Sequence, residues 1–137
     1  MGILKYSVED SKKIVINDAN NVPMIGDDGQ PVVIEIYSPG SKQYASAQSK
    51  RNSQIMNLAK QQGKIQANPD LELLQDANYL ADIVKKAPSN IGEDFPGLSH
   101  RELLIALFTS RPLGYICEQI RKELGDWANF TNSSSPN

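Results

Sequence analysis

Cysteine and histidine are almost absent from this chain of 137 residues, which has one of each, Cys117 and His100. A single cysteine excludes an internal disulfide and is typical of a reducing compartment. One cysteine and one histidine build no zinc site without two carboxylates, and the spacing of the sequence does not supply them. His100 starts a predicted helix and Cys117 lies on an apolar helical stripe, so ordinary structural roles are favoured over a base or a nucleophile.

Long apolar runs and glycine-rich phosphate motifs are also lacking. No stretch approaches the roughly 18 apolar residues of a membrane span, and residues 1–6 do not have the pattern of a secretory signal. No mononucleotide or dinucleotide glycine motif occurs. The run Gly26-Asp27-Asp28-Gly29 lacks the later ligands of a calcium loop and favours a hairpin turn. We therefore expect no membrane contact, no metal, no cofactor and no enzymatic activity.

Charge is present in separate blocks, although the whole chain has a formal net charge of only -2 and a pI near 5.4. Residues 1–41 carry a net charge of -3, residues 42–64 carry +5 without one acidic residue, and residues 65–137 carry -4. A basic segment between two acidic ones can contact phosphates or pair with the rest of the fold. Nucleic-acid-binding domains are usually basic overall, so a nucleic-acid partner is not favoured.

Strand patterns are confined to the first part of the chain. Residues 31–37 form the best strand, because β-branched residues recur on one face. Residues 14–16 are a second apolar run, and residues 22–25 are a candidate third strand. Turn residues at 17–21 and 26–30 separate these segments. The pattern predicts an antiparallel hairpin or small sheet that needs helices packed on its face.

Helical patterns follow. A cap at Ser38 with proline after it introduces a helix over 42–62, which has a thin apolar stripe and a polar middle. Asn68 and Pro69 start a second helix whose last turn is predicted to contain Lys85 and Lys86. Ser99 and Glu102 form a capping box before a short third helix. An apolar stripe from Leu113 to Trp127 predicts the last helix.

The predicted fold class is therefore α+β, with a small N-terminal antiparallel sheet followed by about four helices. We expect one domain over residues 1–131, in which 1–37 is the hairpin region and 38–131 the helical region. Residues 132–137 are expected to be a flexible polar tail.

Two segments resemble the tail assembly chaperones of long-tailed bacteriophages and prophages. Residues 33–44 read Val-Ile-Glu-Ile-Tyr-Ser-Pro-Gly-Ser-Lys-Gln-Tyr and continue to Asn52, which is similar to a strand, a Pro-Gly turn and a helix with a tyrosine and a basic patch in that family. The end of the chain, with Gly-Tyr-Ile at 114–116, Glu-Gln-Ile at 118–120 and Leu-Gly-Asp-Trp-Ala-Asn-Phe at 124–130, is similar to the family's C-terminal part. The resemblance covers about residues 32–60 and 111–131.

This resemblance implies a non-enzymatic role in virion assembly in the bacterial host cytoplasm. Such chaperones bind the helical tape-measure protein, keep it soluble, promote assembly of the tail tube and are absent from the mature virion. In many of these phages a frameshifted, extended form recruits the tail tube protein, and this chain would be the short form. The resemblance also allows for a homo-oligomer.

A chaperone for amphipathic helices needs apolar surface flanked by polar residues. The candidate partner-binding residues lie on the helix over 42–62 and on the last helix. They are Tyr44, Lys50, Arg51, Ile55, Met56, Leu58, Ile116, Ile120, Leu124, Trp127 and Phe130.

Two other functions share the same pattern. A minor tail protein or head–tail connector would have this size and fold class, but it would stay in the virion. A small nucleic-acid-binding regulator would use the basic helix within 42–64 and would depend steeply on salt.

Overall fold

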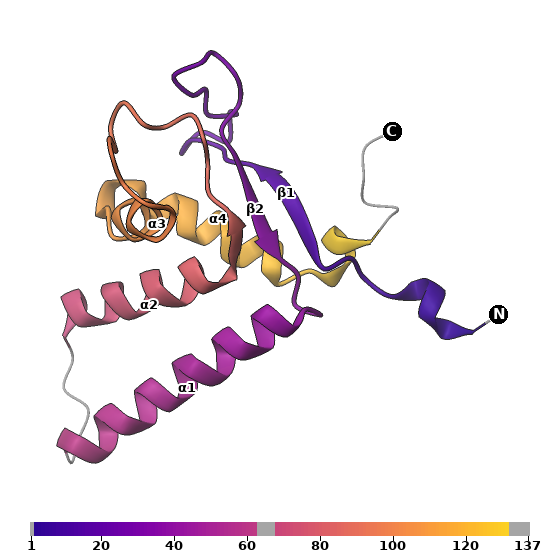
Figure 1. The fold of residues 1–137 in the computed structure, drawn as a ribbon, viewed down its shortest axis with the longest axis vertical. Helices are drawn as coiled ribbons and strands as arrows, with labels where there is room; N and C mark the ends of the chain where they lie inside the picture. The colour runs from indigo at the N-terminus through magenta and orange to yellow at the C-terminus, as the bar shows by residue number, and fades with distance from the viewer. Residues whose placement is uncertain (1, 63–67, 132–137) are drawn as a thin grey trace.

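The sheet of this protein is assembled from strands that lie far apart in the sequence. In the computed structural model, which describes residues 2–62 and 68–131, β1 (Ser11–Val15) pairs antiparallel with β2 (Val33–Tyr37). β2 in turn pairs antiparallel with β3 (Val84–Lys86). The strand with the most β-branched sequence therefore occupies the centre of the sheet (Figure 1).

The third strand is not the segment that the sequence suggested. Residues 22–25 form only isolated bridges, in which Asn17 faces Pro23 and Ile25 faces Pro31. The prediction that Lys85 and Lys86 lie in the last turn of a helix is wrong, because the helix ends at Ile83 and the next three residues form β3. The second edge of β2 offers backbone donors and acceptors, and β3 satisfies them.

Four α-helices and three short 3-10 helices complete the fold within the described residues, which confirms the α+β class. In chain order they are η1 (Ile3–Tyr6), α1 (Lys42–Gln62), α2 (Pro69–Ile83), α3 (His100–Phe108), η2 (Arg111–Leu113), α4 (Gly114–Leu124) and η3 (Trp127–Phe130). The predicted polar tail at 132–137 lies outside the described residues.

Two of the three predicted helix caps are present, at Ser99 and at Asn68. The Ser99 hydroxyl accepts from the Glu102 amide while the Glu102 carboxylate accepts from the Ser99 amide, so the predicted capping box is present. Hydrogen bonding to Ser99 also holds the pKa of Glu102 below its usual value. Asn68 accepts from the Leu71 amide at 3.2 Å and caps α2 as predicted.

α1 spans the predicted residues, but its cap lies three residues beyond the predicted one. Ser38 is buried and its hydroxyl accepts from the Gly40 amide, which closes a turn before the helix. The capping hydroxyl belongs to Ser41, which accepts from the Tyr44 amide at 3.1 Å. The prediction of Ser38 as the cap is therefore wrong, because the Pro39-Gly40 turn is completed before helical geometry begins.

One face of the sheet, together with α2, α3 and α4, encloses the core, whereas Val15 and Val33 on the other face are exposed. The C-terminal Phe130 belongs to this core, and its carbonyl accepts from the Glu9 amide at 2.7 Å. The fully buried large side chains that fill the centre are Phe108, Phe130, Ile16, Ile34, Ile36, Leu80, Ile83, Leu104, Ile116 and Ile120.

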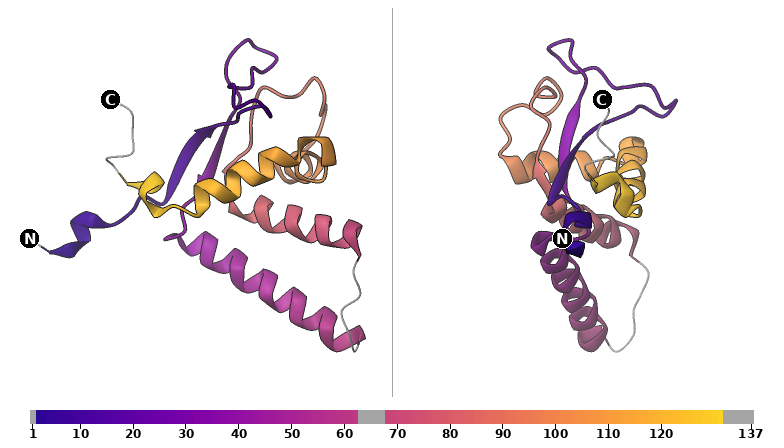
Figure 2. Two further views of the ribbon diagram at one scale, coloured as in Figure 1. Left: turned by 180° about the vertical axis from the view of Figure 1, so that it is seen from behind. Right: turned by 90° about the vertical axis from the view of Figure 1, so that its right-hand side faces the viewer.

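Two parts of the molecule extend from this core in opposite directions. α1 and α2 form a splayed helical hairpin that extends to one side of the sheet, and the N-terminal segment with η1 projects on the other side (Figures 1 and 2). Both projections are therefore available to other molecules.

Candidate interaction surface on the α1–α2 hairpin

The two helices of the hairpin carry opposite charges. α1 contains four basic residues and no acidic one, whereas α2 contains four acidic residues and no basic one. Arg51 pairs with Asp76 at 2.5 Å, and Lys50 pairs with Asp82 at 3.6 Å. The two bases that the sequence suggested for partner binding are thus held by the neighbouring helix of the same chain.

Asp76 joins three helices. Its carboxylate also pairs with Arg121 of α4 at 3.2 Å. The Arg51 guanidinium in addition stacks 4.7 Å from the centre of the Tyr79 ring. Such stacking on an aromatic face favours arginine over lysine, because the guanidinium is planar. The contacts of Asp76 therefore fix the direction of the first half of α1.

Two tyrosines and a glutamine form the next layer of this contact. The Gln48 amide donates to the hydroxyl oxygens of Tyr44 at 2.9 Å and of Tyr79 at 2.6 Å. Burial, with a contribution from Tyr44, raises the pKa of Tyr79 to about 12. Tyr79 is therefore a neutral phenol at physiological pH, which suits a structural role rather than general base catalysis.

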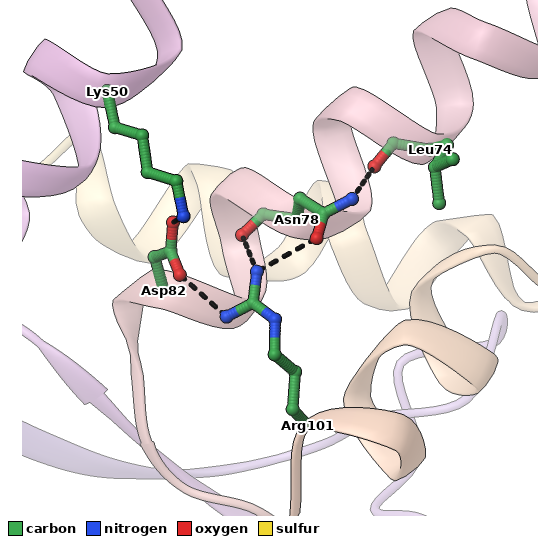
Figure 3. A network of polar contacts seen from close by, with 5 residues as sticks. All are labelled: Lys50, Leu74, Asn78, Asp82 and Arg101. Carbon is green, nitrogen blue, oxygen red and sulfur yellow. Dashed lines mark hydrogen bonds and ion pairs between the residues drawn. The ribbon is translucent and has the colours of Figure 1, made fainter.

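A second network ties the hairpin to α3, and its members converge on Asp82 and Asn78 (Figure 3). Arg101 of α3 donates to Asp82 at 2.7 Å and to the Asn78 side chain at 2.8 Å, while Asp82 also pairs with Lys50. Asn78 in turn donates to the Leu74 carbonyl at 2.9 Å. One acidic side chain thus links α1, α2 and α3.

Beyond these networks the described side chains of α1 are exposed. The side chains of residues 52–57 are all exposed, and so is that of Lys60. Since successive residues are about 100° apart around a helix, six residues sample its whole circumference. Met56 is 59% exposed and Ile55 is 41% exposed, and Leu74 of α2 is also exposed. This half of α1 is the candidate interaction surface.

The other candidate residues have different places. Tyr44 is half-buried in the hairpin, and the side chain of Leu58 is outside the described ones. Of the candidates in the C-terminal part only Trp127 is exposed. Ile116, Ile120, Leu124 and Phe130 are buried core residues and present no surface to a partner in this fold.

The sequence patterns did not identify Asp76 and Asp82 as the residues that hold Lys50 and Arg51. The available signal was the opposite charge of two consecutive helices, which predicts attraction but not the pairs that form.

His100 is exposed at the first position of α3. Cys117 is buried, its thiol lies 3.8 Å from the Phe108 carbonyl, and burial raises its pKa, which disfavours a reactive thiolate.

Among the described residues, no cluster of three or more His, Cys, Asp or Glu side chains could hold a metal ion. No described helix combines the length and the apolarity that crossing a membrane requires.

Comparison of the chain with protein families, curated proteins and solved structures finds no match.

Proposed function

We propose that this protein is a tail assembly chaperone of a long-tailed phage, which binds the helical tape-measure protein, keeps it soluble and promotes assembly of the tail tube. The proposal rests on the resemblance of residues 32–60 and 111–131 to that family. The structural observation that supports it most is the second half of α1, where Ile55 and Met56 lie in a run of exposed residues from 52 to 57.

An exposed helix of this kind suits a helical client. A short helical segment without tertiary contacts is marginal in water, so packing of a second helix against it stabilises both. Ile55 and Met56 would contact the apolar stripe of the client, and methionine adapts to clients of varied shape. Each contact is small, and several copies along one long client would add their affinities through multivalency.

The hairpin networks would serve this function by orienting the surface. Asp76 and Asp82 fix the first half of α1 through Arg51 and Lys50, so the second half projects in a defined direction. These pairs also reduce the support for a nucleic-acid regulator, because both bases would have to leave carboxylates before contacting phosphate.

Co-expression with the long helical protein encoded beside this gene tests the proposal. We expect the client to become soluble and to co-purify with this chain. The double variant Ile55→Glu/Met56→Glu is expected to lower the co-purified client by about tenfold or more, because it places two charges in the apolar contact. Val22→Glu/Ile25→Glu, two exposed apolar residues on the distant loop before β2, is the matched control and should retain the client.

Two results would contradict the proposal. In one, the client stays insoluble and this chain elutes alone. In the other, this chain is found in stoichiometric amounts in purified virions, which would favour a minor tail or connector protein instead. A chaperone that acts in the host cytoplasm would be absent from those particles.

A further inference from the structure

The N-terminal segment exposes three large apolar side chains within four residues. Ile3, Leu4 and Tyr6 are 83%, 82% and 73% exposed, and no residue of η1 is buried. Figure 2 shows that the segment projects away from the sheet and the helices. The ammonium of Lys5 lies 5.1 Å from the centre of the Tyr6 ring. We refer to residues 2–8 as the N-terminal arm.

The base of the arm is fixed, whereas the apolar side chains of its tip are exposed. Val8 packs against the core, and the Glu9 amide donates to the Phe130 carbonyl. Gly40 packs against Val8 and Trp127, because a Cβ added to Gly40 would lie 2.8 Å from the Val8 side chain and 3.3 Å from the Trp127 ring. The arm therefore leaves the body at a defined point beside an exposed tryptophan, and burying its apolar tip requires another surface.

A groove of about 560 Å³ runs between the 17–21 turn and α4. The Gln119 side chain crosses it, donating to the Val15 carbonyl at 2.8 Å and accepting from the Asn17 amide at 2.9 Å. Gln119 thus satisfies the end of the β1 edge in place of a neighbouring strand. Tyr115 contributes an aromatic side chain to the lining.

The charges of groove and arm are opposite. Asp18, Glu118, Glu123 and Asp126 line the groove together with one base, Lys122. In the described part of the chain no hydrogen bond or ion pair engages the carboxylates of Glu118 and Glu123. The arm carries one base, Lys5, and no acid over residues 2–8. The cation of the arm therefore complements the acidic lining, in which Ala19 and Tyr115 are the two apolar residues that its neighbouring side chains would contact.

We propose that the arm of one copy docks in the groove of a second copy, and that the exchange is reciprocal. Asp126, at one end of the groove lining, directly precedes η3, whose Phe130 holds the arm base. One end of the acceptor groove therefore lies near the base of the donor arm, so two copies that meet at this end can exchange both arms in a closed, two-fold dimer. This inference does not depend on the proposed chaperone function.

Sedimentation of the full chain over a range of concentrations tests the exchange. We expect a dimer whose dissociation constant rises by about tenfold or more in Lys5→Glu and in Glu118→Lys/Glu123→Lys. Combining all three substitutions reverses the sign of both partners, and the dissociation constant is expected to return to within about threefold of the original. Ile3→Ser/Leu4→Ser should weaken the dimer without changing the thermal midpoint of the monomer, since both residues are exposed.

Ile25→Ser, on an exposed apolar residue outside both arm and groove, is the control and should leave the dissociation constant unchanged. A chain that remains monomeric at every concentration would overturn the proposal. So would a dimer that ignores the arm variants, or a combined variant that is weaker than either charge reversal alone.

Discussion

Among single residues, Gly26 shows how close packing of backbone constrains sequence. A Cβ added to Gly26 would lie 2.6 Å from the carbonyl oxygen of Asn90 and would also overlap its side chain. That side chain donates to the carboxylate of Asp28 and to the carbonyls of Gln30 and Pro31. The contact at Gly26 thus anchors the long β1–β2 loop to the segment before α3.

Gly26→Ala is expected to lower the free energy of unfolding by about 1–3 kcal/mol, because a backbone carbonyl must move to admit the methyl group. Urea denaturation measures the change. Gly92→Ala is the matched control, since nothing lies within 4 Å of the position that its added methyl group would take, and it should cost much less. Equal losses in the two variants would contradict this explanation.

Tyr79 gives the protein a pH dependence on the alkaline side. Its pKa is raised from 10.0 to about 12 in the folded chain. Below pH 10 the phenol is protonated in both folded and unfolded states. Between pH 10 and about 12 only the unfolded chain releases the proton, so the free energy of unfolding falls as pH rises.

Because Tyr79 is partly solvent-exposed, we expect its share of this fall to be about 1–2 kcal/mol, less than the full shift would give. Urea denaturation at pH 9 to 12 should therefore show a shallower decline for Tyr79→Phe than for the unchanged chain. Parallel declines in both proteins would contradict the raised pKa.

For whole helices, the charge difference between α1 and α2 explains how a largely polar helix is held in place. α1 has few apolar side chains to bury, among them Ala47, and the ion pairs with Asp76 and Asp82 add to its attachment. Asp76→Asn keeps the shape and removes the charge that Arg51 and Arg121 share.

We expect Asp76→Asn to reduce the free energy of unfolding by about 1–2 kcal/mol, since hydrogen bonds to charged groups contribute more than neutral ones. Glu72→Gln on the same helix is the control, because the Glu72 carboxylate pairs with no described residue. Chemical denaturation compares the two variants, and similar losses would show that Asp76 acts only through the net charge of α2.

The elements also show what sequence alone could supply. The caps at Asn68 and Ser99 depend on neighbouring residues and were predictable, as was the extent of the helix over 42–62. β3 could not be predicted, because Val84 continues the apolar spacing of α2. Residues 84–86 form a strand only because β2 presents an unpaired edge to them. The apolar stripe of α4 predicted burial, but the choice between core and partner required the fold.

At the scale of the whole molecule, segments near the two ends of the described chain meet at Glu9 and Phe130. Phe130 is buried under the sheet, and its carbonyl holds the Glu9 amide. Phe130→Ala is expected to reduce the free energy of unfolding by about 3–5 kcal/mol, as for a phenylalanine at the centre of a core. Trp127→Ala, three residues earlier and mostly exposed, should cost far less; thermal unfolding distinguishes the two. Comparable losses would place Phe130 outside the cooperative core.

The connection between Glu9 and Phe130 also sets the order in which a nascent chain can fold. β1 and β2 can pair once residue 37 has been synthesised, but β3 joins their sheet only after residue 86. α4 and Phe130 close the core only after residue 130 has been synthesised. Contacts between such distant residues slow folding, and until they form, the apolar face of the sheet is open. During synthesis, therefore, this protein itself presents the kind of unprotected apolar surface that host folding factors bind.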